Sequence, residues 1–321
     1  MTQTILITGA AGFIGSHLCE RLVDTGHRVV GFDNFCDFYE RSRKEANLDA
    51  KLRRHERFTL IEADIRDRDA VFAAFGEHKP DHVIHIAAMA GVRPSIENPK
   101  YYTEVNLDGT VNLLDAAVAT GCGRFVFASS SSVYGNNEKV PFAEADPVDY
   151  PISPYAATKR SGELICHTYH HLHGLAIACL RFFTVFGPRQ RPDLAISKFL
   201  RLVADDKPIP MFGDGSTSRD YTYIDDIIDG IVAACEHIPT HGYRIWNLGG
   251  SSPVTLREMI RTIGRVVGRE PRIDPKPMQP GDVDRTYADV SRSEAELGYG
   301  PKVSFEQGVR RQWQWLGRQA D

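Results

Sequence analysis

Short apolar runs rich in β-branched residues alternate with segments of helical periodicity through the first half of the chain. In the helical segments, such as 13–23 and 105–118, apolar residues recur three or four positions apart. The short runs are almost continuously apolar, as strands buried on both faces require. They predict strands at Thr4–Thr8, Arg28–Phe32, Phe58–Glu62, His82–Ala87, Arg124–Ser129 and Ala176–Arg181.

This alternation of strands and helices predicts an α/β fold, with a doubly wound parallel sheet covered by helices on both faces. After Arg181 the composition changes, because Pro and Gly become dense. A buried strand expected at Arg244–Leu248 indicates that the chain returns to the first sheet. We therefore expect a first domain at 1–181 with a return segment at 221–248. A smaller α/β domain is expected at 182–220 and 249–321, with helices at Ala195–Ala204, Thr255–Val267 and Phe305–Leu316.

The net charge of the 321 residues is −4, which gives no electrostatic reason to expect nucleic acid or an anionic membrane as partner. No apolar run reaches the roughly 18 residues that a membrane-spanning helix needs. The first residues lack the basic and apolar regions of a signal peptide. Six scattered cysteines without a C-x-x-C pair are typical of free thiols. We expect a cytoplasmic protein.

Three glycines, Gly9, Gly12 and Gly15, follow the first strand directly and open the first helix. Glycines let the backbone turn tightly and bring N–H groups against a pyrophosphate at the positive end of a helix. Three glycines alone also suit a plain structural turn, but the order of strand, turn and helix favours a dinucleotide site. Asp33 ends the second strand, where a carboxylate accepts hydrogen bonds from an adenosine ribose and repels a 2′-phosphate. NAD is therefore favoured over NADP, with Asp64 and Ile65 near the adenine.

Tyr155 and Lys159 are four residues apart in a helical segment, which places both side chains on one face. A tyrosine with a pKa of about 10 is a poor base at neutral pH. A neighbouring ammonium favours its phenolate. The run Ser129–Ser132 follows a strand at the carboxyl edge of the sheet, where open α/β sheets bind ligands. A hydroxyl of this run could share the reacting oxygen of a substrate with Tyr155.

Together these motifs resemble the extended short-chain dehydrogenase/reductase family, and within it the nucleotide-sugar epimerase branch. The similarity covers essentially the whole chain. It implies a Rossmann-type NAD-binding domain, a smaller nucleotide-sugar domain, and a homodimer formed through helices at 99–120 and 155–173. By position, Ser130 is the expected catalytic hydroxyl, Tyr155 the base and Lys159 its partner. The expected cofactor contacts are Gly9, Ala11, Gly12, Phe13, Ile14, Asp33, Asn34, Asp64, Ile65, Ala87, Ala88, Asn106, Tyr155, Lys159 and Val185, with Asn106 bracing the central helices.

The serine run bears on the reaction. Members of this branch begin by taking the proton from the sugar 4-OH and moving the C4 hydride to NAD. The 4,6-dehydratases carry Thr-Asp-Glu at the serine run and the uronate decarboxylases carry a Glu. This chain has Ser130, Ser131 and Ser132, whose neutral hydroxyls cannot supply an acid/base pair. The resemblance therefore implies that the ketone is reduced again from the opposite face, which is epimerisation.

The run Arg181–Asp193 bears on the sugar, because it is similar to the corresponding run of UDP-glucuronate 4-epimerases. UDP-glucose 4-epimerases usually place Asn where Thr184 stands. A neutral set of Ser129, Ser130, Ser131 and Thr184 is expected to hold a C6 carboxylate. Such a hold restrains a 4-keto uronate, which is a β-keto acid, from losing carbon dioxide. Arginine forks suit phosphate oxygens, and the expected remaining substrate contacts are Arg93, Arg191, Arg219, Asp282 and Arg285.

Alternatives remain at this stage. The enzyme alternatives are a UDP-glucose 4-epimerase, a nucleotide-sugar dehydratase or decarboxylase, and a one-way 4-reductase. A non-catalytic NAD-binding interaction protein belongs to another class, but such a protein would usually have lost Tyr155 or Lys159. Four histidines on one helix, His167, His170, His171 and His173, are expected on a solvated face, and we expect no metal. The charged run Glu40–Lys44 is expected to be an exposed helix start.

Overall fold

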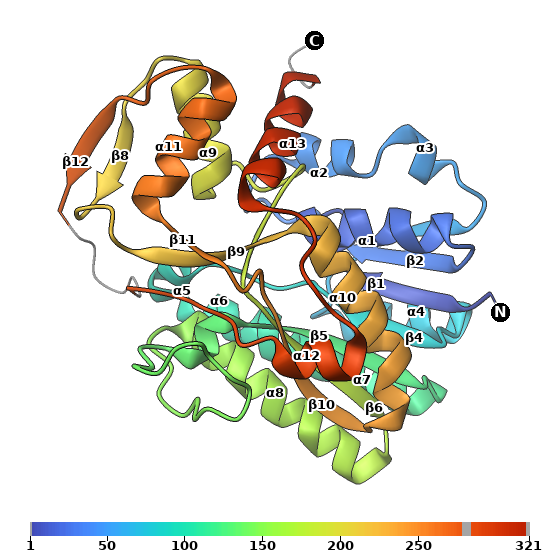
Figure 1. Ribbon diagram of the computed structural model, residues 1–321. Coiled ribbons are helices and arrows are strands. Elements are labelled where there is room, and N and C mark those ends of the chain that lie inside the picture. Colours follow the sequence, from blue (N-terminus) through green and yellow to red (C-terminus); the bar gives the residue numbers. More distant parts are fainter. Residues whose placement is uncertain (1, 278–283, 319–321) are drawn as a thin grey trace.

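A seven-stranded parallel sheet forms the centre of the protein, and a computed structural model describes residues 2–277 and 284–318 (Figure 1). The strand order is β10-β6-β5-β4-β1-β2-β3, which confirms the predicted α/β fold. β4 ends two residues before its predicted end, whereas β2, β5 and β6 each run one residue further. The strands are β1 (Thr4–Thr8), β2 (Arg28–Asp33), β3 (Phe58–Glu62), β4 (His82–His85), β5 (Arg124–Ser130), β6 (Ala176–Phe182) and β10 (Tyr243–Leu248).

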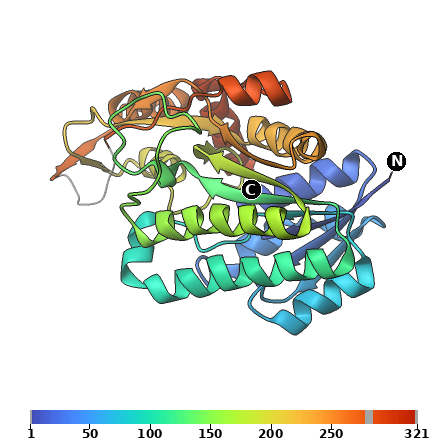
Figure 2. The same ribbon diagram turned by 90° about the horizontal axis from the view of Figure 1, so that it is seen from below.

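Both faces of this sheet are buried. In β1, Ile5 and Ile7 belong to one apolar cluster, while Leu6 between them belongs to the other. Successive side chains of a strand point to opposite faces, so a continuously apolar strand needs a helix layer on each side. One layer is α1 (Phe13–Asp24) and α10 (Ile224–His237). The other is α4 (Arg68–His78), α7 (Gly109–Thr120) and α8 (Pro154–His173), seen side by side in Figure 2.

The chain leaves the sheet after β6 and returns to it at β10. The pairing of β10 with β6 is parallel and runs from Tyr243 opposite Ile177 to Leu248 opposite Phe182. The strand predicted at Arg244–Leu248 is therefore confirmed. The segment after β10 does not all leave the sheet again, because α12 (Ser291–Leu297) packs against β10 and α10.

The remaining elements form a lobe above the carboxyl ends of the large sheet in Figure 1. One small sheet has the order β11-β9-β7 and another pairs β12 with β8. Helices α9, α11 and α13 contact one another beside them, and all three helices were predicted. These elements are β7 (Thr184–Phe186), α9 (Ala195–Ala204), β8 (Ile209–Phe212), β9 (Ser218–Tyr223), β11 (Pro253–Thr255), α11 (Leu256–Val267), β12 (Ile273–Lys276) and α13 (Phe305–Arg318).

Short helices complete the described part of the chain. They are α2 (Arg41–Asn47), α3 (Ala50–Arg53), α5 (Val92–Glu97), α6 (Pro99–Thr103), a π-helix (Glu104–Asp108) and 3₁₀ turns (Ser131–Tyr134 and Ile238–Thr240). β7 starts only one residue after β6 ends, so the lobe is attached directly at the carboxyl edge of the large sheet. Within residues 2–277 and 284–318, no helix combines the length and apolarity that crossing a bilayer would require.

Candidate active site

A cavity of about 530 Å³ lies at the carboxyl ends of β1 and β4, where the strand order of the sheet reverses. Open α/β sheets bind ligands in the crevice at such a switch point. Most of the residues predicted from the sequence line it together. They are Gly9, Gly12, Phe13, Ile14, Asp33, Asn34, Asp64, Ile65, Ala87, Ala88, Ser129, Ser130, Ser131, Tyr155, Thr184, Val185 and Arg191.

The glycine turn between β1 and α1 leaves no room for a side chain at Gly9 or Gly15. Gly9 has φ +71°, and a Cβ there would lie 2.8 Å from the Ala87 nitrogen. A Cβ on Gly15 would lie 2.0 Å from the Gly9 oxygen. The N-cap of α1, Gly12, has no side chain to bond the first amides of the helix. These amides are therefore available to an anion at the edge of the cavity.

Asp33 connects the glycine turn to the end of β2. Its Oδ2 accepts a hydrogen bond from the Ala11 nitrogen at 2.9 Å, and its Oδ1 accepts one from the Phe35 nitrogen at 2.8 Å. Burial raises the pKa of this carboxyl, and the two hydrogen bonds act against that rise. Each carboxylate oxygen keeps another lone pair for a ribose hydroxyl. The glycine turn, the helix end and this carboxylate thus fit the pyrophosphate and ribose of a dinucleotide.

Lys44 is a cavity residue that the sequence reading missed. The run Glu40–Lys44 was expected to be exposed, which is wrong for Lys44, since its side chain is buried and lines the cavity. Its Nζ donates to the carbonyl oxygen of Cys36 at 2.6 Å. Asn47, three residues further on α2, donates from Nδ2 to the Ala11 oxygen at 3.0 Å. The helical spacing of Lys44 and Asn47 was the signal that one face of this helix packs against the glycine turn.

Tyr155 lies in the first turn of α8, whose N-cap is the hydroxyl of Ser153. Burial raises the pKa of the Tyr155 phenol, while a hydrogen bond with Ser130 and the positive charge of Arg191 lower it. Lys159 was expected to be the group that favours the phenolate. Its Nζ lies 5.9 Å from the centre of the Tyr155 ring and donates to the Ala128 oxygen at 2.7 Å. Burial also lowers the pKa of Lys159 to about 8.

The hydroxyls of the serine run have different partners. Ser129 Oγ donates to Glu163 Oε1 at 2.6 Å, so its single proton is already used. Towards the cavity Ser129 therefore offers lone pairs. Ser130 Oγ instead accepts from the Ser132 nitrogen at 3.1 Å, which leaves its own proton for Tyr155 or a ligand.

Asn106 braces the cavity wall against α8. Its Nδ2 donates to Thr158 Oγ1 and to the Met89 oxygen, both at 3.0 Å, and its Oδ1 accepts from the Met89 nitrogen at 2.8 Å. Because the side chain is buried in the π-helix, all these bonds are shielded from water. Asn106 thus acts behind the cavity surface, as Ala11 and Lys159 do, rather than on it.

The arginines expected to bind the substrate lie in different places. Arg191 is on the cavity wall, where its guanidinium pairs with Asp193 and lies 4.7 Å from the centre of the Phe38 ring. Arg219, on β9, donates to the Ser218 oxygen at 2.9 Å, and Ser218 forms a β-bridge with Arg285. Arg219 and Arg285 are thus neighbours in the lobe, outside the lining of the cavity.

Two more expected contacts need mention. Arg93, at the start of α5, lies 5.7 Å from the centre of the Phe212 ring and also stands outside the lining. It therefore bridges α5 to β8 of the lobe. Asp282 lies outside the described residues.

Known proteins are similar to this chain over almost its whole length. The sequence model of the GDP-mannose 4,6-dehydratase family matches residues 6–312. A UDP-glucuronate 4-epimerase of Thermodesulfobacterium geofontis is 41% identical over 311 residues, covering 97% of this chain and 95% of that protein. The crystal structure of a UDP-glucuronic acid 4-epimerase from Bacillus cereus, in complex with UDP-glucuronic acid and NAD, has a TM-score of 0.92 and 37% identity. That likeness covers 98% of this chain and 99% of the other.

A second solved structure is similar but has a different substrate. The UDP-glucose 4-epimerase of Thermotoga maritima, crystallised with UDP-glucose, has a TM-score of 0.90 and 29% identity, covering 99% of this chain and 100% of that one. Fold alone therefore does not separate a uronate from a neutral hexose. Because the family model and these relatives match almost the whole chain, this chain belongs to the GDP-mannose 4,6-dehydratase family, a branch of the extended short-chain dehydrogenases/reductases.

Proposed function

We propose that this chain is an NAD-dependent 4-epimerase that interconverts UDP-glucuronate and UDP-galacturonate. The observation that carries the proposal concerns the segment from Ser129 to Tyr134, called the serine turn below. Its serines carry no charge and line the cavity wall beside Tyr155. The base that starts the reaction is present, while the acid/base pair that dehydration would need is absent from Ser130, Ser131 and Ser132. Two of the relatives named above are UDP-glucuronate 4-epimerases.

The first half of the reaction removes a proton and a hydride from the carbinol at C4. Tyr155, as phenolate, takes the proton of the 4-hydroxyl, and Ser130 donates its hydrogen bond to the same oxygen. Lys159 supports the phenolate by its positive charge from behind the serine turn. When bound, NAD supplies the acceptor for the hydride that leaves C4 and later returns it.

In the second half of the reaction the 4-keto sugar has to rotate inside the cavity. The ketone then presents its opposite face, and Tyr155 gives the proton back to the oxygen at C4. No group has to be added to or lost from the sugar, so the serine turn only has to donate hydrogen bonds. This is the role its neutral hydroxyls suit.

The C6 carboxylate is proposed to accept hydrogen bonds from Ser131 and Thr184, which line the cavity on two adjoining elements. Ser130 also lines the cavity, but its single proton is given to the oxygen at C4. Ser129 lines it as well, but its proton is donated to Glu163, so it can only accept. Its proposed contact is therefore with a sugar hydroxyl rather than with the carboxylate. A carboxylate held in this way is kept from the orientation in which a β-keto acid loses carbon dioxide.

The nucleotide half of the substrate is proposed to extend into the lobe, which takes up 182–220 and 249–321 apart from α12, while 1–181 and 221–248 hold the cofactor. Arg191 is the proposed diphosphate contact on the cavity wall. Arg219 and Arg285, which neighbour each other at β9, are proposed to hold the diphosphate from the lobe side. The remaining proposed contacts are Arg93 beside the sugar and Asp282 on the uridine ribose.

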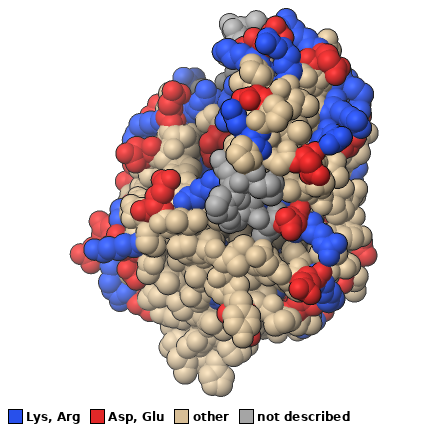
Figure 3. Space-filling view, turned by 90° about the vertical axis from the view of Figure 1, so that its left-hand side faces the viewer, with Lys and Arg blue, Asp and Glu red and all other residues tan. Residues whose placement is uncertain are grey.

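We also propose that the protein is a homodimer in the cytoplasm. Large apolar side chains are exposed on α8 at Leu164 (53%) and Leu172 (65%), two turns apart, and this is the helix expected at the interface. The lower part of the face drawn in Figure 3 also carries few charged side chains. Six free cysteines, five of them buried, suit a reducing compartment.

The test is to incubate the purified protein separately with UDP-glucuronate and UDP-glucose and to follow the sugars by NMR. The expected result is conversion of UDP-glucuronate to an equilibrium mixture with UDP-galacturonate. If only UDP-glucose is converted, the substrate is a neutral hexose and not a uronate, and the protein is a UDP-glucose 4-epimerase like the Thermotoga relative. Bound NAD without turnover of either sugar would leave only a binding protein.

A further inference from the structure

We propose that the buried ion pair of Glu163 and Arg181 positions the serine turn of the active site by holding both of its ends. Neither residue lines the cavity, so both are positioning residues rather than catalytic ones. The proposal rests on the proposed epimerase function, since its effect is measured on the fate of the 4-keto sugar.

The pair itself is fully enclosed. The side chains of Glu163 and Arg181 are 0% and 1% exposed. Arg181 donates from Nε to Glu163 Oε1 at 2.8 Å and from its second fork nitrogen to Oε2 at 2.9 Å. Arg160 is a third donor to the carboxylate and bonds its Oε2 at 3.2 Å. A two-pronged pair of this kind has one geometry, so it can act as a rigid reference point between α8 and β6.

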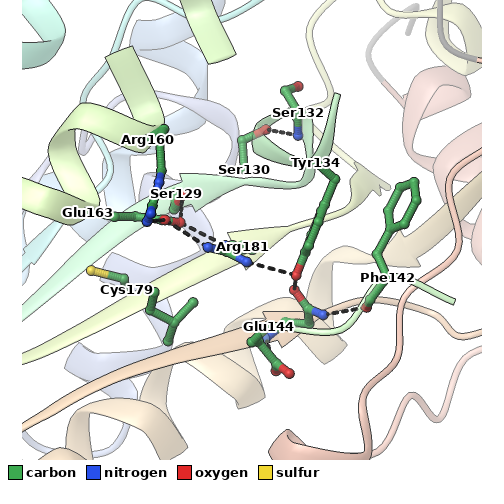
Figure 4. Close-up of polar contacts among 12 residues, drawn as sticks. Ser129, Ser130, Ser132, Tyr134, Phe142, Glu144, Arg160, Glu163, Cys179 and Arg181 are labelled. Carbon is green, nitrogen blue, oxygen red and sulfur yellow. Dashed lines mark hydrogen bonds and ion pairs between the residues drawn. The ribbon is translucent and has the colours of Figure 1, made fainter. Parts of the chain in front are cut away.

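The first end of the turn is fixed by Glu163. The carboxylate of Glu163 also accepts a hydrogen bond from the Ser129 hydroxyl, which donates to Oε1 at 2.6 Å (Figure 4). A carboxylate surrounded by these donors acts only as an acceptor, so the direction of the Ser129 hydroxyl is set. Ser129 is the residue immediately before Ser130, whose hydroxyl bonds Tyr155.

The second end of the turn is fixed by Arg181. The third nitrogen of its fork donates to the phenol oxygen of Tyr134 at 3.0 Å (Figure 4). The Tyr134 hydroxyl donates a hydrogen bond to Asn247 Oδ1 at 2.7 Å. Asn247 in turn donates to the carbonyl oxygens of Phe142 and Asp289, at 2.8 Å and 3.0 Å. The turn from Ser129 to Tyr134 is thus bonded at both ends to one ion pair.

The geometry gives the pair a role in the reaction. Ser130 and Ser131 lie between the two fixed ends and have to meet the 4-oxygen and the C6 carboxylate at hydrogen-bond distance. A shift of the turn of about 1 Å would cost reaction rate. It would also weaken the hydrogen bonds that hold the carboxylate of the 4-keto uronate. Decarboxylation then breaks the C5–C6 bond, releases carbon dioxide and adds one proton at C5, which leaves a UDP-4-keto-pentose. Because the hydride taken from C4 would then remain on the cofactor, NAD has to be supplied in excess for the keto-pentose to accumulate.

The first test variant cuts one end of the turn and leaves the bonds between Arg181 and Glu163 and the cavity lining in place. Tyr134→Phe removes the phenol oxygen between Arg181 and Asn247, and Tyr134 does not line the cavity. The matched control is Tyr243→Phe, because the Tyr243 hydroxyl donates to the backbone oxygen of the same Glu163 at 3.0 Å. Each variant loses one tyrosine hydroxyl that is bonded to a residue of the ion pair, but only the first releases the turn. Ser129→Ala, which cuts the other end, is the second test variant.

Both kcat and the ratio of 4-keto-pentose to epimer are measured by NMR at a temperature where all proteins remain folded. We expect Tyr134→Phe to lower kcat roughly 10- to 100-fold with a smaller change in KM, and to raise the keto-pentose share severalfold. Ser129→Ala should change both in the same direction, and Tyr243→Phe should match the wild type in both. Equal kcat and equal product ratios in Tyr134→Phe and Tyr243→Phe would overturn the proposal. A wild-type protein without turnover of UDP-glucuronate would overturn the proposed function itself, which the variants do not test.

Discussion

The ammonium of Lys159 donates a hydrogen bond of 2.7 Å to the carbonyl oxygen of Ala128. This bond joins the catalytic helix α8 to the last residues of β5, one residue before the serine run starts. The side chain is 3% exposed, and burial lowers its pKa to about 8. Lys159 thus has two tasks, because it ties the helix to the strand and places a positive charge 5.9 Å from the centre of the Tyr155 ring.

Lys159→Met should therefore lower kcat by a factor on the order of 10² to 10⁴, the usual contribution of a general base and its support. The reason is that the Tyr155 phenolate loses the nearest positive charge on α8. Steady-state rates with UDP-glucuronate measure the effect. Lys100→Met is the control, because Lys100 is 88% exposed and should leave kcat unchanged. A Lys159→Met protein with full kcat would show that the lysine serves only the fold.

Tyr155→Phe should lower kcat by a factor of about 10³ or more while the protein stays folded and keeps its cofactor. The aromatic ring stays in its contact with Tyr102, at 6.4 Å between the ring centres, and only the proton-accepting oxygen is lost. The measurement is single-turnover epimerisation together with the NAD content of the purified protein. Tyr102→Phe is the matched control, since the Tyr102 hydroxyl donates to the Ala90 oxygen outside the serine turn. Undiminished epimerisation by Tyr155→Phe would exclude this residue as the base.

Ser130→Ala should move the acid limb of the pH profile of kcat/KM to higher pH. The hydrogen bond with Ser130 lowers the pKa of Tyr155, against the larger effect of burial, which raises it. Without that bond the phenolate is less favoured, so a higher pH is needed for the same fraction of base. Rates measured from pH 6 to pH 10 with wild type and variant give the comparison, and Ser132→Ala serves as the control. An acid limb that stays in place would show that Ser130 does not act on Tyr155.

The sequence predicted most of the large sheet because its strands are buried on both faces and therefore read as continuous apolar runs. It also predicted the glycine turn, since no side chain fits at Gly9 or Gly15. The burial of Lys44 was not predicted, because a charged run is typical of an exposed helix and the helical spacing of Lys44 and Asn47 was not used. The position of the Lys159 ammonium behind the serine turn was not predicted either. Helical spacing places it on the same face as Tyr155 but does not say which carbonyl oxygen its ammonium meets.

The partners of Ser129 were equally hidden in the sequence. Glu163 lies two helical turns after Tyr155, but Arg181 and Tyr134 come from a strand and from the 3₁₀ turn. Their contact depends on the register between β5 and β6, in which Ser129 stands opposite Arg181. Such a register is set by packing across the whole sheet, so residue spacing alone does not reveal it.

His85 should make the protein less stable in mild acid. Thr110 donates to the Asn106 oxygen and so accepts from His85 Nε2, which leaves Nδ1 to accept from Thr8. Burial, followed by the charge of Lys159, lowers the pKa of His85 to about 3 from its ordinary 6.5. The unfolded chain therefore binds a proton that the folded protein refuses, and stability falls as the pH drops below 6.5. From pH 7 to pH 5 this loss is about 2 kcal/mol.

His85→Gln should reduce this acid sensitivity, because a glutamine amide accepts from Thr8 and donates to Thr110 without titrating. Urea unfolding at pH 5 and pH 7 gives the difference in the free energy of unfolding for each protein. His237→Gln is the control, since His237 is exposed and should keep the wild-type difference. The same pH difference in His85→Gln as in wild type would show that His85 already carries its proton when folded.

Thr184→Val should weaken the hold on a uronate while sparing a neutral sugar. Thr184 opens β7 on the cavity wall, with its backbone paired in register with Tyr221, so valine can replace it with little change of shape. A hydrogen bond to a charged group contributes about 1.5–3 kcal/mol, which corresponds to a rise in KM for UDP-glucuronate of roughly 10- to 100-fold. A carboxylate that is held less firmly should also let more of the 4-keto sugar lose carbon dioxide.

Thr222→Val is the matched control, because the Thr222 hydroxyl is buried without a partner among the described residues, so losing it should leave KM unchanged. If Thr184→Val kept the wild-type KM and product ratio, the carboxylate would have to be held elsewhere on the cavity wall, and Ser131 would be the next residue to change.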